Sequence, residues 1–366
     1  MKKHHLLTIT LFLCLFFAIS SCEKDDSEDY TELPPPASVS PVVLDLTAVP
    51  YQKLSDYKFY DGQMKNMEPA LGVLPYDLNS TLFTDYARKK RFIWMPEDVS
   101  ASYIADNKSL DFPAGTVLIK NFYYNNVLPD NKTIIIETRL MIKKADGWIF
   151  ANYIWNDEQT EAILDMDGGF KNISWQEGTE TKNINYRIPT GSDCFTCHKT
   201  SATAIPIGPK PQNLNKQYTY TDGAKNQFVK WKEMGYLDNS MPSDITSTVD
   251  WTDTSQPLEL RARSYIDINC AHCHTVGAHC DYMSMRFAFH ETGDPQNLGI
   301  CITPFEFINN QPYIISAGQP DNSALYYRMN TNMGSLMMPL IGRTIVHTEG
   351  VALMQEWISS MDTTCP

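Results

Sequence analysis

Basic residues are scarce in this 366-residue chain: 30 lysines and arginines stand against 43 aspartates and glutamates, and the formal net charge is −13 at pH 7. This excess of negative charge argues against nucleic acid and against an anionic membrane surface as partners. Histidine is also rare, with eight residues. We find no convincing Ser/His/Asp set for nucleophilic catalysis and no glycine-rich loop of the kind that binds phosphate. The acidic balance suits a basic protein partner.

One apolar run, Leu6–Ile19, follows a basic start at residues 1–5 and is too short to span a membrane as a mature anchor. Small residues then precede Cys22. This order predicts a lipoprotein signal at residues 1–21, with Cys22 as the lipidated N-terminus; a plain secretory signal is the alternative. We therefore expect an outer-membrane lipoprotein that faces the periplasm or the cell surface. The acidic residues Glu23–Asp26 resemble a surface-export signal, and they could equally belong to an acidic tether.

Nine cysteines are present, and four of them form two C-x-x-C-H motifs: Cys194 to His198 (CFTCH) and Cys270 to His274 (CAHCH). This pattern is typical of covalent attachment of haem c. The thiols of Cys194 and Cys197, or of Cys270 and Cys273, can bond the two vinyl groups of one porphyrin, and the following histidine ligates the iron. We therefore expect two covalently bound haem c groups. A disulfide or half of a zinc site is the alternative, but zinc usually takes four ligands.

The iron above His274 needs a ligand on its other face. Met338, followed by Pro339, lies downstream and just ahead of a predicted closing helix. This placement resembles the distal Met-Pro loop of class I cytochromes c, and a thioether ligand raises the reduction potential relative to a second histidine. Met338 is therefore our expected axial ligand, and the adjacent Met337 is the alternative.

The opposite ligand of the iron at His198 is less defined by the sequence. Met241 precedes a proline, as Met338 does, and is our candidate. Met234 is a second option on a predicted helix. His279 or His290 could also reach this iron from the region of the second motif.

Four cysteines remain outside the two motifs and the lipidation site. Cys14 leaves with the signal, and export permits disulfides among the others. Cys280 and Cys301 flank one short stretch and could form a local disulfide, which would leave Cys365 unpaired. The connectivity cannot be fixed from sequence.

Residues 22–50 are acidic and proline-rich and are expected to form a tether. Residues 51–185 are dominated by β-branched and aromatic residues, which favour strands. Predicted strands lie at 90–96, 115–124, 132–144 and 148–155. An Asp146-Gly147 turn between the last two strands predicts a hairpin.

Residues 186–256 carry the first motif, and the chain from Asn183 to Ser192 looks extended or looped. In residues 257–366, apolar residues at helical spacing predict one helix before Cys270 and another that starts at an N-cap, Thr348. This arrangement is typical of a small class I cytochrome c. We expect an α+β multidomain fold: an antiparallel β-rich domain, a haem-bearing segment and a C-terminal all-α class I cytochrome c-like domain.

The chain as a whole resembles a largely uncharacterised family of exported bacterial di-haem c-type cytochromes. The resemblance rests on LNSTLFTDY at 78–86, FPAGT at 112–116, ETRL at 137–140, IGP at 207–209 and NCAHCH at 269–274. Members of this family usually have Met-Pro-Pro where this chain has Met-Pro-Leu from Met338. The resemblance implies electron transfer and brings no known substrate.

We therefore expect an electron carrier, and not an enzyme, that passes single electrons between protein redox partners, anchored to the outer membrane by its lipid. Two alternatives remain open. The chain could be a di-haem enzyme such as a cytochrome c peroxidase, which needs one iron with a releasable ligand site. It could also be a redox subunit or sensor of a dehydrogenase complex.

Overall fold

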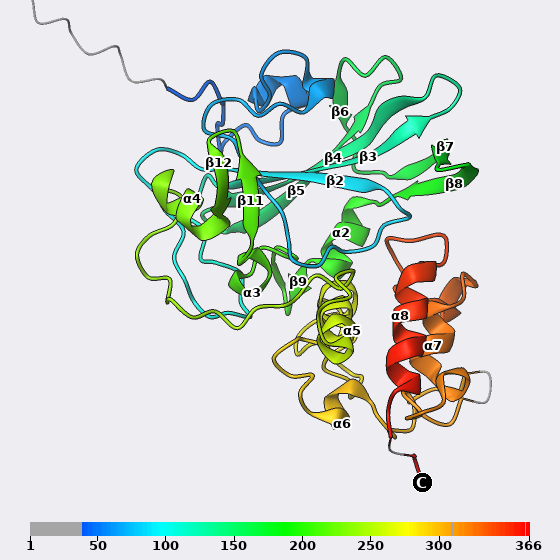
Figure 1. The fold of residues 1–366 in the computed structure, drawn as a ribbon. Helices are drawn as coiled ribbons and strands as arrows, with labels where there is room; N and C mark the ends of the chain where they lie inside the picture. Colours follow the sequence, from blue (N-terminus) through cyan, green and yellow to red (C-terminus); the bar gives the residue numbers. More distant parts are fainter. Residues whose placement is uncertain (1–38, 309–310, 363) are drawn as a thin grey trace, which may run out of the picture. The chain divides into compact units, whose positions relative to one another are not determined.

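A large antiparallel sheet of eight strands dominates the fold (Figure 1). The computed structural model describes residues 39–308, 311–362 and 364–366. The predicted signal at 1–21, the lipidation site Cys22 and the tether as far as residue 38 lie outside the described residues. Residues 40–366 belong to one compact unit, which contains every element discussed below.

The strands follow the chain in a simple order, β1-β2-β3-β4-β5-β6, and β7 joins this sheet beside the end of β3 and pairs with β8. Their bounds are β1 (Leu74–Tyr76), β2 (Arg88–Trp94), β3 (Val117–Val127), β4 (Lys132–Lys144), β5 (Gly147–Trp155), β6 (Ala162–Leu164), β7 (Gly169–Glu177) and β8 (Glu180–Ile188). Two small two-stranded sheets pair β9 (Lys199–Thr200) with β10 (Thr203–Ala204) and β11 (Gln217–Tyr220) with β12 (Gly223–Asn226).

The predicted strands at 90–96, 115–124, 132–144 and 148–155 are present as β2 to β5. The predicted hairpin is also present, because Lys144 pairs with Gly147 across a two-residue turn. The segment from Asn183, expected to be extended or looped, is extended as far as Ile188, where β8 ends.

Side chains alternate between the two faces of the sheet, and each face is covered by a different part of the chain. Phe92, Ile119, Leu140 and Ala151 face the segment 42–73 in one buried core. Ile93, Leu118, Met141 and Phe150 face the other way and pack in a second core with residues 207–241. The first C-x-x-C-H motif is therefore reached from this second face.

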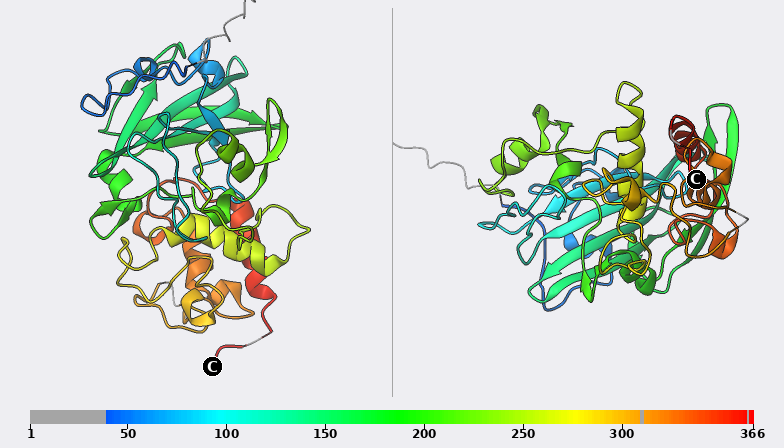
Figure 2. Two further views of the ribbon diagram at one scale, coloured as in Figure 1. Left: turned by 90° about the vertical axis from the view of Figure 1, so that its left-hand side faces the viewer. Right: turned by 90° about the horizontal axis from the view of Figure 1, so that it is seen from below.

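The helices are short and follow the sheet in the chain; the views in Figure 2 show them gathered on one side of it. Their bounds are α2 (Gly191–Cys197), α3 (Pro211–Leu214), α4 (Gln227–Glu233), α5 (Leu258–Ile266), α6 (Pro295–Leu298), α7 (Ala324–Met329) and α8 (Thr348–Ser359). A π-helical turn, η3 (Asp267–Ala271), extends α5, and four 3-10 turns lie at η1 (Leu54–Tyr57), η2 (Met64–Asn66), η4 (Pro320–Asn322) and η5 (Gly334–Leu336).

The predicted fold class is wrong, because residues 257–366 do not form an all-α class I cytochrome c-like domain. The structure has mainly antiparallel sheet, and this region holds only small helices: α5, α6, α7 and α8 have 9, 4, 6 and 12 residues. Isolated bridges such as Ile300 to Ile315 lie between them. The apolar periodicity that predicted α5 and α8 is real, but between them glycine, proline and polar residues favour irregular chain.

The C-terminal region is instead joined to the sheet region by polar contacts. The carboxylate of Asp85 accepts hydrogen bonds from the backbone of Thr344 at 2.7 Å and of Ile345 at 3.2 Å. The hydroxyl of Tyr86 donates to Glu349 at 2.7 Å. Burial raises the pKa of Asp85, so these bonds from backbone amides offset part of the cost of burying its charge.

Helices α5 and α8 meet at Gly350, where any side chain would overlap the phenol ring of Tyr265. The Tyr265 hydroxyl lies 2.9 Å from Nδ1 of His347, and the His347 ring stacks on Phe83 with centroids 4.0 Å apart. Burial lowers the pKa of His347 to about 4. His347 is also the N-cap of α8, and the predicted cap, Thr348, is the first residue of the helix.

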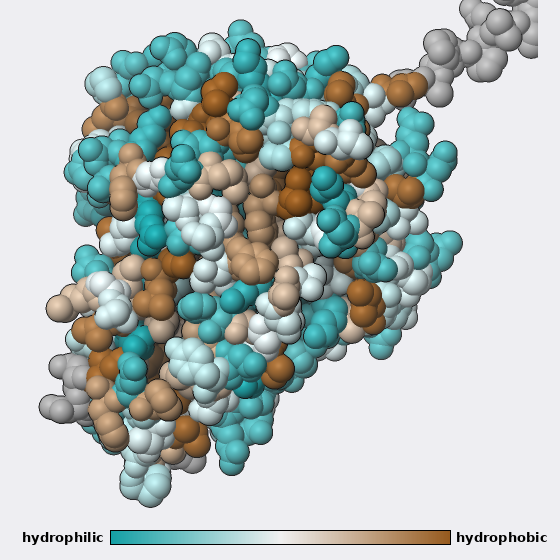
Figure 3. Space-filling model, turned by 180° about the vertical axis from the view of Figure 1, so that it is seen from behind, coloured by the Kyte–Doolittle hydropathy of each residue, from teal (hydrophilic) through white to brown (hydrophobic). Residues whose placement is uncertain are grey.

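Apolar and polar side chains are interspersed over the face shown in Figure 3, where apolar groups form several small clusters. Within the described ranges, no helix combines the length and the apolar character needed to cross a bilayer.

Candidate functional site

The first motif is carried by α2, which sequence reasoning missed. Thr190 caps this helix: its side chain accepts a bond from the Asp193 amide, and the Asp193 carboxylate accepts one from the Thr190 amide. Thr-x-x-Asp is a recognisable capping box, so the signal was present in the sequence. One turn of α2 holds Cys194 and Cys197, and the amide of His198 donates to the Cys194 carbonyl at 2.9 Å.

The imidazole of His198 is held in one orientation. Its Nδ1 lies 3.0 Å from the carbonyl oxygen of Ile205, and its ring packs near Phe150. Burial lowers the pKa of His198 to about 3, so the ring is neutral at physiological pH. A neutral ring that donates from Nδ1 to a carbonyl presents a lone pair on Nε2, as metal-binding histidines do.

The second motif begins in the π-helical turn η3 that ends α5. The amides of Cys273 and His274 both donate to the Cys270 carbonyl, at 3.1 and 3.0 Å, so the motif closes one tight turn. His274 is 7% exposed, and burial lowers its pKa to about 4. Its Nδ1 is buried and has no hydrogen-bond partner among the described residues.

The two motifs, far apart in the sequence, meet in space. One potential ligand atom from each of Cys197, His272 and Cys273 lies within 4.8 Å of the others. The neighbouring thiol of Cys273 lowers the pKa of Cys197 to about 5, and the neighbouring Cys197 together with burial raises the pKa of Cys273. His272 occupies a variable position inside the second motif, and the structure places its imidazole beside Cys197 of the first motif.

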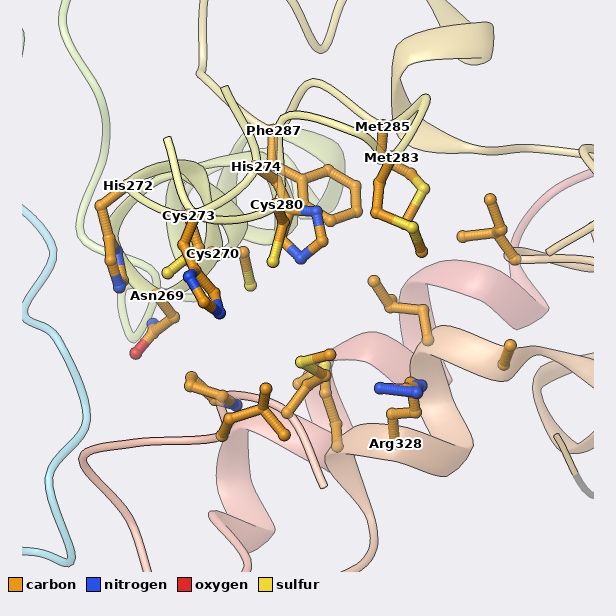
Figure 4. A pocket seen from close by; sticks show the side chains of 18 of the residues that line it. Asn269, Cys270, His272, Cys273, His274, Cys280, Met283, Met285, Phe287 and Arg328 are labelled. Atoms are coloured by element: carbon orange, nitrogen blue, oxygen red, sulfur yellow. The ribbon is translucent and has the colours of Figure 1, made fainter. Parts of the chain in front are cut away.

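A cavity with about 1250 Å³ of empty space, part of it open to solvent, adjoins the second motif. Cys270, Cys273 and His274 line it, and Met338 lines it as well. Figure 4 shows the labelled motif residues on one side and Arg328, from α7, across the cavity. Nη1 of Arg328 is buried and without a partner in the described chain. The structure therefore brings together the predicted residues of the second site.

A second cavity, with about 1200 Å³ of empty space, adjoins the first motif. Cys194, Cys197 and His198 line it from α2, and Lys120 and Arg139 line it from the sheet. The sequence alone predicts no role for either cation, although Arg139 lies in the ETRL segment at 137–140. Their placement follows from the strand register, which puts both side chains on the face of the sheet that is directed toward α2.

The two cavities, below called the first and second cavity after their motifs, share a wall. Cys197, His272, Pro339 and Ile341 line both. The loop that carries Met338 therefore runs between the two motifs. Whatever group occupies one cavity lies next to the other.

The Met338 loop is held by one buried guanidinium. Arg343, 3% exposed, donates to the carbonyl oxygens of Met338 at 3.0 Å, Ile345 at 3.1 Å, Arg328 at 3.0 Å and Thr331 at 2.7 Å. Four carbonyl contacts from one rigid planar group fix the path of this loop.

The candidates for the ligand opposite His198 are not brought to the first cavity. Met241 is buried and Met234 half-buried in the core formed with the sheet. His290 pairs with Asn107 at 2.8 Å and lines neither cavity, and His279 lines the second cavity. The methionine that lines the first cavity is Met141 of β4, which sequence reasoning did not single out.

The predicted Cys280–Cys301 disulfide is wrong, because Cys301 pairs with Cys365 across a Cα–Cα distance of 5.2 Å. The Cys301 amide donates to the Ile315 carbonyl, and Cys365 lies against the same carbonyl, so both cysteines are drawn to one point. Cys280 is instead a free thiol in the wall of the second cavity, with its amide bonded to the Cys273 carbonyl at 3.0 Å.

No model of a known protein family matches this chain, no curated protein is similar to it, and no solved structure matches its fold. The resemblance to exported di-haem cytochromes therefore stays a prediction. The argument for function rests on the two cavities themselves.

The residues of both cavities fit the group that the motifs predict. Each cavity offers two thiols and one neutral imidazole from a single motif. Each also has buried polar atoms without a partner among the described residues: Arg328 Nη1 in the second cavity, and Arg139 Nε with the Asn152 amide in the first. Buried polar atoms of this kind normally have partners, so they indicate that a polar ligand completes each cavity.

Proposed function

We propose that this protein is an exported, lipid-anchored c-type cytochrome that holds two haems and passes single electrons between protein partners. One observation carries the proposal: each of two adjoining cavities is lined by the two thiols and the imidazole of one C-x-x-C-H motif. Haem supplies a one-electron ferrous/ferric couple when bound.

The chain's residues have distinct roles in this proposal. Cys194 and Cys197, or Cys270 and Cys273, would hold one haem through thioether bonds to its two vinyl groups, and each thiol would supply both the sulfur and the hydrogen of one addition. This addition needs reduced thiols and no oxidant. His198 offers Nε2 because Nδ1 is bound to the Ile205 carbonyl.

Met338 would help to hold the haem iron at the second motif through its thioether sulfur, since it lines the same cavity as His274. The shared wall explains why one chain would carry two centres. Electrons would pass between two sites that adjoin each other.

The test is haem stoichiometry in protein matured in a haem-attaching periplasm, measured by pyridine haemochrome absorption and intact mass. We expect two covalent haems in the native chain. The double variants Cys194→Ala/Cys197→Ala and Cys270→Ala/Cys273→Ala should each retain one. Cys280→Ala is the matched control, because it removes a cavity thiol outside both motifs and should retain two.

A chain that matures without covalent haem would overturn the proposal. One specific observation would then favour a second function, a structural or regulatory metal site. The thiols of Cys197 and Cys273 and an imidazole nitrogen of His272 already lie within 4.8 Å of one another, a donor set that suits zinc. Metal analysis of the same preparation would show about one zinc per chain, lost in Cys197→Ala and in Cys273→Ala.

A further inference from the structure

Three cations and one amide form a row across the sheet at the first cavity. The strand register pairs Arg91 with Lys120, Lys120 with Arg139, and Arg139 with Asn152. Directly paired residues of neighbouring strands project from the same face, and like charges in that position destabilise a sheet. A row of this kind therefore requires negative charge to balance it.

The protein supplies only part of that negative charge. Arg91 pairs with Asp77 at 2.6 Å, and Arg139 pairs with the buried carboxylate of Glu137. Lys120, between them, has no ion pair and no side-chain hydrogen bond within the described ranges, and its ammonium lies over the ring of Phe122 at 4.8 Å. Burial, Arg91 and Lys89 together lower the pKa of Lys120, as expected for a cation without a counter-charge.

Lys120, the cation of the row without an ion pair in the described chain, faces the first cavity together with two of its neighbours in the row. Lys120, Arg139 and Asn152 all line it. Asn152 is 1% exposed, and both of its side-chain polar atoms are buried without a partner in the described chain, as is Nε of Arg139. The wall thus presents one free ammonium, one free guanidinium N–H and one free amide to the space that His198 also faces.

We propose that Lys120, Arg139 and Asn152 bind the propionate carboxylates of the haem attached at Cys194 and Cys197. This inference rests on the proposed function. Haem carries two carboxylates, and a buried carboxylate requires charged and hydrogen-bonding partners. The row offers these partners on the cavity wall, and the lone pairs of the Asn152 amide oxygen remain for water or a protonated carboxyl.

The row also sets the reduction equilibrium of the first centre. The ferric form carries one more positive charge than the ferrous form. Removing the Lys120 ammonium leaves a propionate unbalanced, and this negative charge stabilises the ferric form. Loss of Lys120 therefore lowers the reduction potential of the first centre.

The test compares Lys120→Met with Lys89→Met in the full haem-loaded protein. Lys89 is the matched control: it lies on the same face of β2, also without an ion pair among the described residues, but does not line the cavity. In Lys120→Met we expect the reduction equilibrium of one haem to shift about tenfold toward the ferric form, ~59 mV for one electron. Lys89→Met should shift it several-fold less, and Lys120→Arg should stay close to the native value.

Equal shifts in Lys120→Met and Lys89→Met, with two haems in both, would overturn the role of the row and leave the proposed function intact. Native protein without covalent haem at Cys194 and Cys197 would overturn both. Thermal unfolding of the haem-free chain gives an independent readout. Lys120→Met should be at least as stable as the native apoprotein, because it removes a half-buried charge that has no ion pair within the described ranges; a clear loss of stability would show that Lys120 serves the protein's own packing.

Discussion

The two cavities present the same motif on very different supports. The first cavity has the sheet as its floor, so strand register fixes Lys120 and Arg139, and α2 fixes the thiols. The second is built from short helices and irregular chain; the Arg343 contacts hold its Met338 loop, and the Cys301–Cys365 disulfide cross-links the chain next to its Ile314 wall. The comparison shows that the same C-x-x-C-H motif can be supported by secondary structure or by cross-links and side-chain contacts, and the two supports should fail in different ways.

The largest expected effect is a loss of stability that should affect the second cavity more than the first. Replacing Cys301 and Cys365 by serine opens a loop with a sequence separation of 64 residues, which should lower the free energy of unfolding by ~4 kcal/mol. Amide hydrogen exchange should rise in α7 and the Met338 loop and change little in β4. Cys280→Ser, a free thiol in the same region, is the control; equal exchange in α7 and β4 would contradict the comparison.

The junction between the two regions should weaken in acid through His347. Its folded pKa of about 4 lies below the ordinary value near 6.5, so the unfolded chain takes up the proton first. Stability from this residue is complete above pH 6.5 and is lost as the pH falls toward 4, by at most ~3 kcal/mol.

The measurement is the difference in unfolding free energy between native protein and His347→Phe across that pH range. Phenylalanine keeps a ring against Phe83 and cannot be protonated. The difference should shrink as the pH falls, and parallel pH profiles would show that His347 does not carry the acid sensitivity.

A ligand substitution should affect one centre and spare the other. Met338→His exchanges a thioether for an imidazole at the second motif and should lower the potential of that centre by on the order of 100 mV, which is ~2.3 kcal/mol per electron. The first centre should keep its potential in a redox titration followed by absorption. Met337→His, at a position that lines neither cavity, is the matched control.

The smallest effect concerns the contact of α5 with α8. Helix propensity alone would make Gly350→Ala stabilising by about 1 kcal/mol. Because the new methyl group would overlap Tyr265, we expect a loss of ~1–3 kcal/mol in chemical denaturation instead. Ser359→Ala, at an exposed position of the same helix, should be neutral or slightly stabilising. A stabilising Gly350→Ala would mean that α5 and α8 can separate without cost.

Local patterns predicted local structure well in this chain. The hairpin of β4 and β5 followed from alternating apolar residues around Asp146-Gly147, and α5 and α8 followed from apolar residues at helical spacing. The fold of residues 257–366 could not be predicted from such patterns, because two helices do not determine how the irregular chain between them is packed. The Cys301–Cys365 disulfide could not be predicted either, since the pairing depends on which cysteines the fold brings together.

In the candidate site too, local features could be predicted from the sequence and contacts between distant segments could not. The thiols and histidine of each motif could be identified from residues adjacent in the sequence, and α2 could have been predicted from its capping box at Thr190. The wall that the two cavities share at Cys197 and His272 could not be predicted, because it joins segments that are distant in sequence. The cationic row also needed strand register, because Lys120 and Arg139 stand on different strands and appear unrelated along the chain.

In the cytochrome that we propose, the buried guanidinium of Arg343 would also affect the speed of electron transfer. By binding four carbonyl groups it holds the Met338 loop in place through contacts within the protein itself. A side chain held in this way moves little when the charge beside it changes, so each electron requires little rearrangement of the surrounding atoms. A low reorganisation energy would let the second centre exchange electrons quickly even with a partner that offers little driving force.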